Sequence, residues 1–221
     1  MKIENREITV YPADPVPDGR AGILWVIGGH EDTDALFASL PHPRPALAVV
    51  GGIDWNRELS PWKAEKVFAN GEDFDGEADA FLHLLTEKLI PETEDALALT
   101  PAFRGIAGYS LGGLFAVWSL YKTALFDRAA SVSGSLWFDG FLAFAKETPL
   151  TQKPVRLYLS YGDREPKTRN PRMRTVGVCT EELAAYYGSI GIPTVTEVNP
   201  GGHFDEPDKR LAKGLCAILR L

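Results

Sequence analysis

The chain has 221 residues and a net charge of -7, with 45% hydrophobic and 24% charged residues, as in an ordinary soluble globular protein. This acidic balance argues against a general nucleic-acid-binding protein, and no apolar run is long enough to span a membrane. We expect one domain over residues 1–221, and a cytoplasmic location because the charged N-terminal residues lack the apolar core of a signal peptide.

Short apolar runs alternate with helical patterns along the chain. Strands are expected over residues 8–11, 22–27, 46–50, 103–107, 128–133, 155–161 and 194–198. Helices are expected over residues 32–40, 76–90, 111–122, 138–146, 170–190 and 205–219, and residues 54–62 read as a polar loop. The alternation predicts an α/β fold with a mostly parallel central sheet and helices on both faces. Residues 137–154 leave room for one helix, so we expect a minimal cap domain or none.

One motif organises the chain: residues 108–112 read Gly-Tyr-Ser-Leu-Gly, a match to the Gly-x-Ser-x-Gly nucleophile elbow. Such an elbow turns a strand abruptly into a helix, so residues without bulky side chains are needed on both sides of the serine. The expected strand before Ser110 and the expected helix after it fit this geometry. The alternative is a glycine-rich turn in which Ser110 is merely buried.

A serine hydroxyl needs a base, and the chain offers four histidines. His83 falls in a predicted helix and His42 in a proline-rich loop, whereas His30 follows a glycine pair. His203 stands in the loop between the last strand and the last helix, which is the place of the base in a Ser…acid…His chain order. We therefore predict His203 as the base.

The base needs an acid that fixes its tautomer. Asp163 and Glu165 both follow the strand at 155–161, between the serine and the histidine. We favour Glu165, because three residues past a strand-ending glycine is a frequent acid position in hydrolases of this fold. In the alternative, both carboxylates pair with neighbouring cations on a solvated surface.

A tetrahedral intermediate also needs backbone N–H donors. The N–H of Leu111, directly after the serine, is one candidate. Gly29 and Gly52 lie in the glycine pairs that end two early strands, and either could bring a second N–H close to a ligand.

Positive charge is concentrated after the expected acid loop of this acidic chain. Arg172 and Arg174 fall near the expected start of a helix, where the helix dipole disfavours cations. We therefore expect these arginines, together with Arg57, to bind an anionic substrate; a solvated charged face is the alternative.

These motifs resemble the Putative esterase (esterase D-like) family of α/β-hydrolases, and within it the enterochelin and salmochelin trilactone esterases. The similar stretches are residues 49–53, 57–61, 76–91, 105–113, 133–137 and 162–165. The resemblance implies an α/β-hydrolase fold, a Ser110–His203 pair with an acid that is weak or absent in some relatives, and a substrate site lined by Arg57 and Trp137. We count Tyr109, beside the serine, as a further substrate-binding candidate. We expect neither the export signal of the periplasmic members nor the N-terminal domain of the cytoplasmic ones in this chain.

The sequence thus predicts a serine carboxylic ester hydrolase that works through an acyl-enzyme on a small-molecule ester, bulky or anionic, such as a siderophore trilactone. This chemistry implies no metal and no organic cofactor, and the two cysteines are too few for a zinc site. An acyltransferase with the same serine, or a non-catalytic binding protein of the same fold, are the alternatives. The sequence does not predict the oligomeric state.

Overall fold

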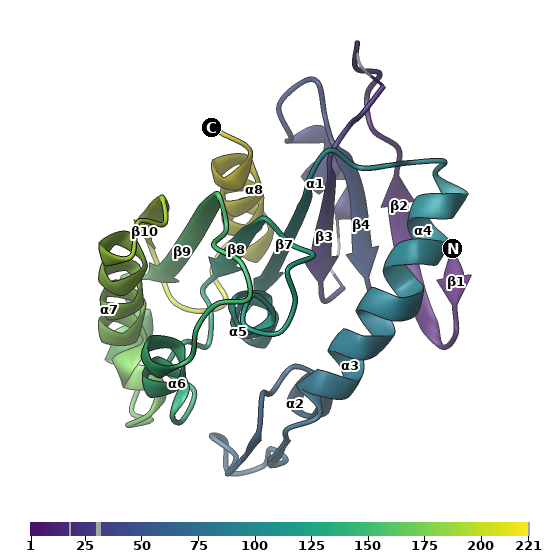
Figure 1. Ribbon diagram of the computed structural model, residues 1–221. Helices are drawn as coiled ribbons and strands as arrows, with labels where there is room; N and C mark the ends of the chain where they lie inside the picture. Colours follow the sequence, from purple (N-terminus) through teal and green to yellow (C-terminus); the bar gives the residue numbers. More distant parts are fainter. Residues whose placement is uncertain (18, 30–31, 221) are drawn as a thin grey trace.

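In the computed structural model, which describes residues 1–17, 19–29 and 32–220, one twisted sheet runs through the molecule (Figure 1). Among these residues its strands follow the order β1-β2-β4-β3-β7-β8-β9-β10. The six strands from β4 to β10 in this order are parallel to one another, whereas β2 is antiparallel to both β1 and β4. The strands of this sheet are β1 (Lys2–Ile3), β2 (Arg6–Tyr11), β3 (Ile23–Ile27), β4 (Ala46–Val50), β7 (Arg104–Tyr109), β8 (Arg128–Val132), β9 (Arg156–Gly162) and β10 (Thr194–Asn199).

Helices cover both faces of the sheet, as the alternation of the sequence predicts. They are α1 (Thr33–Ala38), α2 (Trp55–Glu58), α3 (Ala78–Leu84), α4 (Ile90–Ala96), α5 (Leu111–Ser119), α6 (Phe141–Glu147), α7 (Val176–Ser189) and α8 (Pro207–Leu219). A π-helical turn (Leu85–Leu89) joins α3 to α4, and two 3₁₀ turns (Glu165–Lys167 and Met173–Thr175) precede α7. A separate hairpin of β5 (Lys63–Ala64) and β6 (Phe74–Asp75) lies between β4 and α3 in the chain. No helix of the described residues is long and apolar enough to cross a bilayer.

The side chains of each buried strand alternate between two apolar cores. Trp25 of β3 packs into the larger core with residues of α3, α5, α6 and α7, such as Phe81 and Phe115. Its neighbours Leu24 and Val26 point into the smaller core beneath α1 and α8. Burial on both faces explains why the central strands read as continuous apolar runs in the sequence.

The carboxyl ends of the parallel strands lie along one edge of the sheet. Ser110 follows β7, Glu165 comes three residues after β9, and His203 comes four residues after β10. The topology therefore brings together residues that are up to 93 positions apart in the chain. This edge is where α/β sheets place their ligand sites.

Candidate active site

Ser110 lies on a sharp corner between β7 and α5. Its backbone torsions, φ 55° and ψ -120°, fall in a region that residues with side chains seldom occupy. Hydrogen bonds hold the corner on both sides: the Ser110 N–H donates to the carbonyl of Val132, and the Ser135 N–H donates to the carbonyl of Ser110. The local structure therefore has the geometry of the nucleophile elbow that the motif predicts.

The two glycines of the motif are required by close backbone approaches. A Cβ atom on Gly108 would lie 2.3 Å from the carbonyl carbon of Gly112, and a Cβ atom on Gly112 would lie 2.6 Å from the carbonyl oxygen of Ile27. Real Cβ contacts are longer than this, so any side chain at either position would displace the main chain. The first turn of α5 is thus pressed against the ends of β7 and β3.

A continuous hydrogen-bonded chain joins the three residues predicted for catalysis. The Nε2 atom of His203 is 3.0 Å from the Oγ atom of Ser110, and its Nδ1 atom is 2.7 Å from Oε2 of Glu165. The Glu165 side chain is only 5% exposed, and its Oε1 atom accepts the Gly162 N–H at 2.7 Å. The structure therefore brings the predicted serine, histidine and glutamate together.

The environment of Glu165 favours its ionised form. Burial alone raises the pKa of this carboxyl, but the hydrogen bond and charge of His203 and the N–H of Gly162 outweigh burial and leave the pKa below its ordinary value. An ionised carboxylate at Nδ1 holds the proton on that nitrogen, which leaves Nε2 as the acceptor that faces Ser110.

Asp163, the alternative acid, has a different place. Its Oδ1 atom accepts the N–H of Gly201 at 2.7 Å, and its own N–H donates to the carbonyl of Asn199. Asp163 therefore anchors the loop that carries His203, and its carboxylate is already engaged there.

The predicted oxyanion donors separate into two groups. Leu111 lines the cleft at Ser110, and its N–H lies in the first turn of α5, where no intrahelical carbonyl can accept it. Gly29 comes two residues after Ile27, the last residue of β3, whose carbonyl lies against Gly112 in the same turn of α5. Gly52 follows β4, one strand further out, and packs against the carbonyl of Asn5. Of the two glycines, Gly29 is therefore on the strand nearer to β7, and the second oxyanion donor stays a prediction. His30 lies outside the described residues.

A cleft of about 230 Å³ with several aromatic side chains in its wall opens over Ser110 and His203. Its wall includes the following residues: Trp55, Asn56, Val67, Phe68, Phe74, Ser135, Trp137, Met173 and Phe204. A second hollow of about 300 Å³ shares Phe68, Trp137 and Met173 with the cleft and adds Arg164 and Lys167. The Trp137 prediction is thereby supported by position, whereas the other aromatic residues of the wall were not predicted.

The arginines predicted to bind an anion are each engaged by other groups of the protein. The Nε atom of Arg57 donates to Glu77 at 2.7 Å, and Arg172 forms an ion pair with Asp139, also at 2.7 Å. The Nε atom of Arg174 donates to the carbonyl of Thr168. None of the three is among the residues that line either hollow. The sequence pattern detected a local excess of charge, but carboxylates distant in sequence neutralise part of it.

Tyr109 also differs from its expected role. Its side chain is buried and its hydroxyl donates to the backbone carbonyl of His203 at 2.6 Å. Burial raises the pKa of this phenol, so it stays a donor at neutral pH. Tyr109 therefore holds the backbone of the loop that carries His203 instead of facing a substrate.

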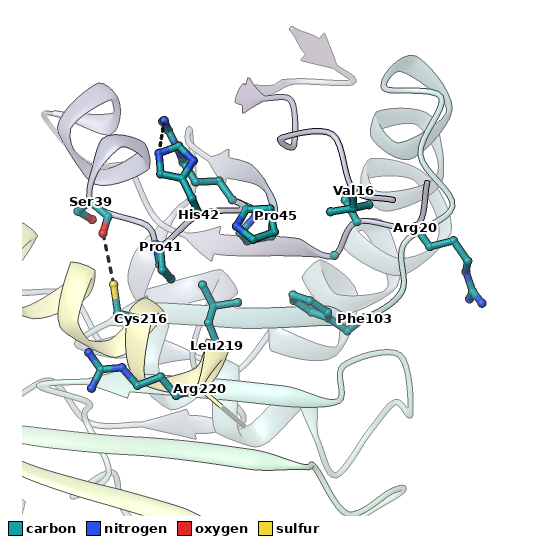
Figure 2. Close-up of a pocket in the computed structure, with 14 residues that line it drawn as sticks. Val16, Arg20, Ser39, Pro41, His42, Pro45, Phe103, Cys216, Leu219 and Arg220 are labelled. Carbon is teal, nitrogen blue, oxygen red and sulfur yellow. Dashed lines mark hydrogen bonds between the residues drawn. The ribbon is translucent and has the colours of Figure 1, made fainter. Parts of the chain in front are cut away.

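A larger hollow, of about 580 Å³, lies at the opposite end of the sheet (Figure 2). Its lining includes Gly22, Pro45 and Phe103, which come just before β3, β4 and β7. His42 lies in its wall and is hydrogen-bonded to Asp14, with Cys216 nearby on α8. It is remote from Ser110, so size alone does not identify the reactive site here.

Comparison with known proteins agrees with this fold. The family model described as Putative esterase matches residues 10–206, and the chain belongs to this family. It is a carboxylic ester hydrolase of the α/β class. The protein YbbA of Bacillus subtilis (strain 168) is 28% identical over 185 residues, which are 78% of this chain and 74% of YbbA.

Solved structures share the fold at lower identity. The siderophore hydrolase EstA from Aspergillus nidulans superposes with a TM-score of 0.71 at 18% identity, over 94% of this chain and 92% of EstA. The BES protein from Bacillus cereus gives a TM-score of 0.75 at 18% identity, over 96% of this chain and 90% of its own. The enterochelin esterase from Shigella flexneri gives 0.69 at 19% identity, and 97% of this chain matches 55% of that protein.

Proposed function

We propose that the protein hydrolyses carboxylic esters through an acyl-enzyme formed on Ser110. The observation that carries this proposal is the chain from Ser110 Oγ to His203 Nε2 at 3.0 Å and from His203 Nδ1 to Glu165 at 2.7 Å. These distances lie in the range needed for direct proton transfer from a nucleophile to a base that a third group orients.

In this mechanism Ser110 Oγ attacks the ester carbonyl carbon while His203 takes the hydroxyl proton. The N–H of Leu111 and that of Gly29 stabilise the negative charge that develops on the carbonyl oxygen. When the intermediate collapses, the imidazolium gives its proton to the departing alkoxide, and the alcohol leaves. Water then attacks the acyl-enzyme with His203 again as base, and the carboxylic acid is released.

The cleft favours esters with a compact aromatic or apolar acyl group. Its wall is rich in aromatic rings, and its volume of about 230 Å³ suits a single ring system. The adjoining hollow leaves room for a larger alcohol portion, in line with the bulky substrates that the names of the siderophore hydrolase and the enterochelin esterase indicate. Recognition of an anion through Arg57, Arg172 and Arg174 is not supported, because their side chains bind Glu77, Asp139 and Thr168.

The test combines a serine variant with a panel of esters. Ser110→Ala should lower hydrolysis of aryl esters by at least about 10³-fold while the melting temperature stays near that of the wild type. A fluorophosphonate probe should label the wild type at Ser110 and leave the variant unlabelled. Full activity in Ser110→Ala, or labelling at another residue, would refute the proposal.

A second arm tests the substrate preference. Matched neutral and anionic aryl esters should show the same ratio of kcat/KM in the wild type and in Arg172→Met. A selective loss for the anionic ester would restore the anion hypothesis. Adding an alcohol acceptor and analysing the products would reveal acyl transfer as transesterified product.

A further inference from the structure

A buried arginine lies directly behind the proposed triad. Arg210 is in the first turn of α8, and its side chain is only 3% exposed. One of its nitrogens, Nη1, is 3.3 Å from Oε1 of Glu165 and 3.0 Å from Oγ of Ser133. The other, Nη2, donates to the carbonyl of Pro200 at 2.8 Å. A single guanidinium thus touches the acid and the start of the loop that carries the base.

Stability alone is a weak explanation for this arrangement. A cation near the N-terminus of a helix is unfavourable with respect to the helix dipole. A buried ion pair is often no more stable than apolar side chains of the same volume, because both charges lose their hydration. The guanidinium also leaves little room for a side chain at position 162, because a Cβ atom on Gly162 would lie 3.0 Å from Nη1 of Arg210.

The contacts of Arg210 are instead suited to fixing the orientation and the effective charge of Glu165. The Oε1 atom of Glu165 is held by Arg210 and by the Gly162 N–H, which turns Oε2 toward His203. The positive charge also offsets part of the negative charge of Glu165. Without Arg210, Glu165 would present its full negative charge to the imidazole of His203.

We propose that Arg210 is a positioning residue of the triad: it fixes the orientation of Glu165 and limits the negative charge that Glu165 presents to His203. This inference rests on the proposed function of Ser110 and His203. It adds a fourth side chain, from α8, to a site otherwise built on the ends of β7, β9 and β10.

The other charged groups around this pair do not duplicate Arg210. Asp205 is paired with Arg164 at 2.8 Å, and the Asp163 carboxylate accepts the N–H of Gly201. Glu206, at the start of α8, is paired with Lys209. Lys167 is exposed and lines the outer hollow, and Tyr109 offers a neutral hydroxyl. Among the described groups, Arg210 is the cation in contact with the Glu165 carboxylate.

The experiment compares Arg210→Met with Arg210→Lys in the full-length enzyme. The dependence of kcat/KM on pH reports the pKa of the free base through its acid limb. In Arg210→Met the acid limb should move to higher pH by about one unit, because the full charge of Glu165 then stabilises the imidazolium. The plateau of kcat should also fall roughly ten- to a hundredfold as Glu165 loses its orientation. In Arg210→Lys the charge remains, so the acid limb should stay near that of the wild type while the plateau still falls.

Controls separate this role from a structural one and from the proposed function itself. Arg128 is another buried arginine, paired with Asp127 at the far end of β8, and Arg128→Met should leave the acid limb unchanged. NMR titration of His203 in the Ser110→Ala background should show the same rise in pKa when Arg210→Met is added, without any need for activity.

An unshifted acid limb in Arg210→Met, an equal shift in Arg210→Lys, or failure of both variants to fold would overturn the proposal. Full esterase activity in Ser110→Ala would instead overturn the proposed function.

Discussion

Replacing Glu165 by glutamine is the sharpest test of the proposed triad. The substitution keeps the size of the side chain but removes the charge that holds the proton on Nδ1 of His203, 2.7 Å away. The amide can donate to Nδ1, which would place the imidazole proton on Nε2, where it blocks proton transfer from Ser110. The corresponding change in the Ser-His-Asp triad lowers kcat by about 10⁴, so we expect a loss of about 10³- to 10⁴-fold in Glu165→Gln.

The same substitution should also destabilise the fold, because it leaves Arg210 as a buried charge with no counter-ion. Glu165 and Arg210 are 5% and 3% exposed, so solvent screens them little. Removing one partner of such a pair costs about 3–5 kcal/mol in the free energy of unfolding. For a chain of this size that corresponds to a fall of roughly 10 °C in melting temperature.

Asp163→Asn is the matched control, since it makes the same chemical change two residues away. The asparagine oxygen can still accept the N–H of Gly201, so kcat should fall less than about tenfold and the melting temperature should hardly change. Steady-state kinetics on an aryl ester and thermal unfolding by circular dichroism check both variants. A larger loss of kcat in Asp163→Asn than in Glu165→Gln would refute the assignment of the acid.

Two further predictions concern the elbow and acid pH. Gly112→Ala should lower kcat by about a hundredfold and reduce the melting temperature, because its Cβ would meet the Ile27 carbonyl at 2.6 Å. Gly188→Ala, in a helix with no atom within 4 Å of the new Cβ, should instead raise the free energy of unfolding by about 0.5–1 kcal/mol; similar melting temperatures for the two variants would contradict this reasoning. The pKa of Glu165 is lower in the folded state than its ordinary value of 4.5, so its contribution to stability is present above pH 4.5 and is lost as the pH falls through the lower folded value. Urea unfolding between pH 3 and 6 should show this loss as a fall in the free energy of unfolding of the wild type. An equally steep dependence of the free energy of unfolding on pH in Glu165→Gln would count against it.

The main elements of the fold could be predicted because their signals are local. β4 has the predicted bounds, residues 46–50, since proline residues precede the apolar run and a glycine pair follows it. Shorter elements were missed: β1, β5 and β6 have two residues each, too few to show a period, and the one-turn helix α2 lies in the segment read as a loop. The predicted helix from residue 76 is interrupted by a π turn just before Pro91, whose missing N–H removes a helical hydrogen bond. Likewise α7 starts at Val176, six residues later than predicted, after two 3₁₀ turns.

The candidate site was predicted where chain order carries information and missed where contacts are long-range. Ser110 and His203 follow from the motif and from the order of elements. Arg57 and Arg172 were assigned to a ligand because nothing in the local sequence reveals their partners, Glu77 and Asp139, which lie 20 and 33 residues away. Arg210 gave no signal, because it looks like one more charged residue at the start of a helix. The aromatic wall of the cleft was also missed, because Trp55 lies in the one-turn helix α2, inside the segment read as a loop, and Phe68 lies outside every predicted element.

The segment between β4 and α3, which holds α2 and the β5–β6 hairpin, has a consequence for how the enzyme can change. It supplies Trp55, Asn56, Val67, Phe68 and Phe74 to the cleft, while the reacting side chains lie beyond the ends of the sheet strands. Preference for one acyl group over another is thereby carried by a part of the chain that can be exchanged without moving the reacting atoms. Grafting this loop between family members should therefore transfer selectivity while the bond-breaking steps continue as before.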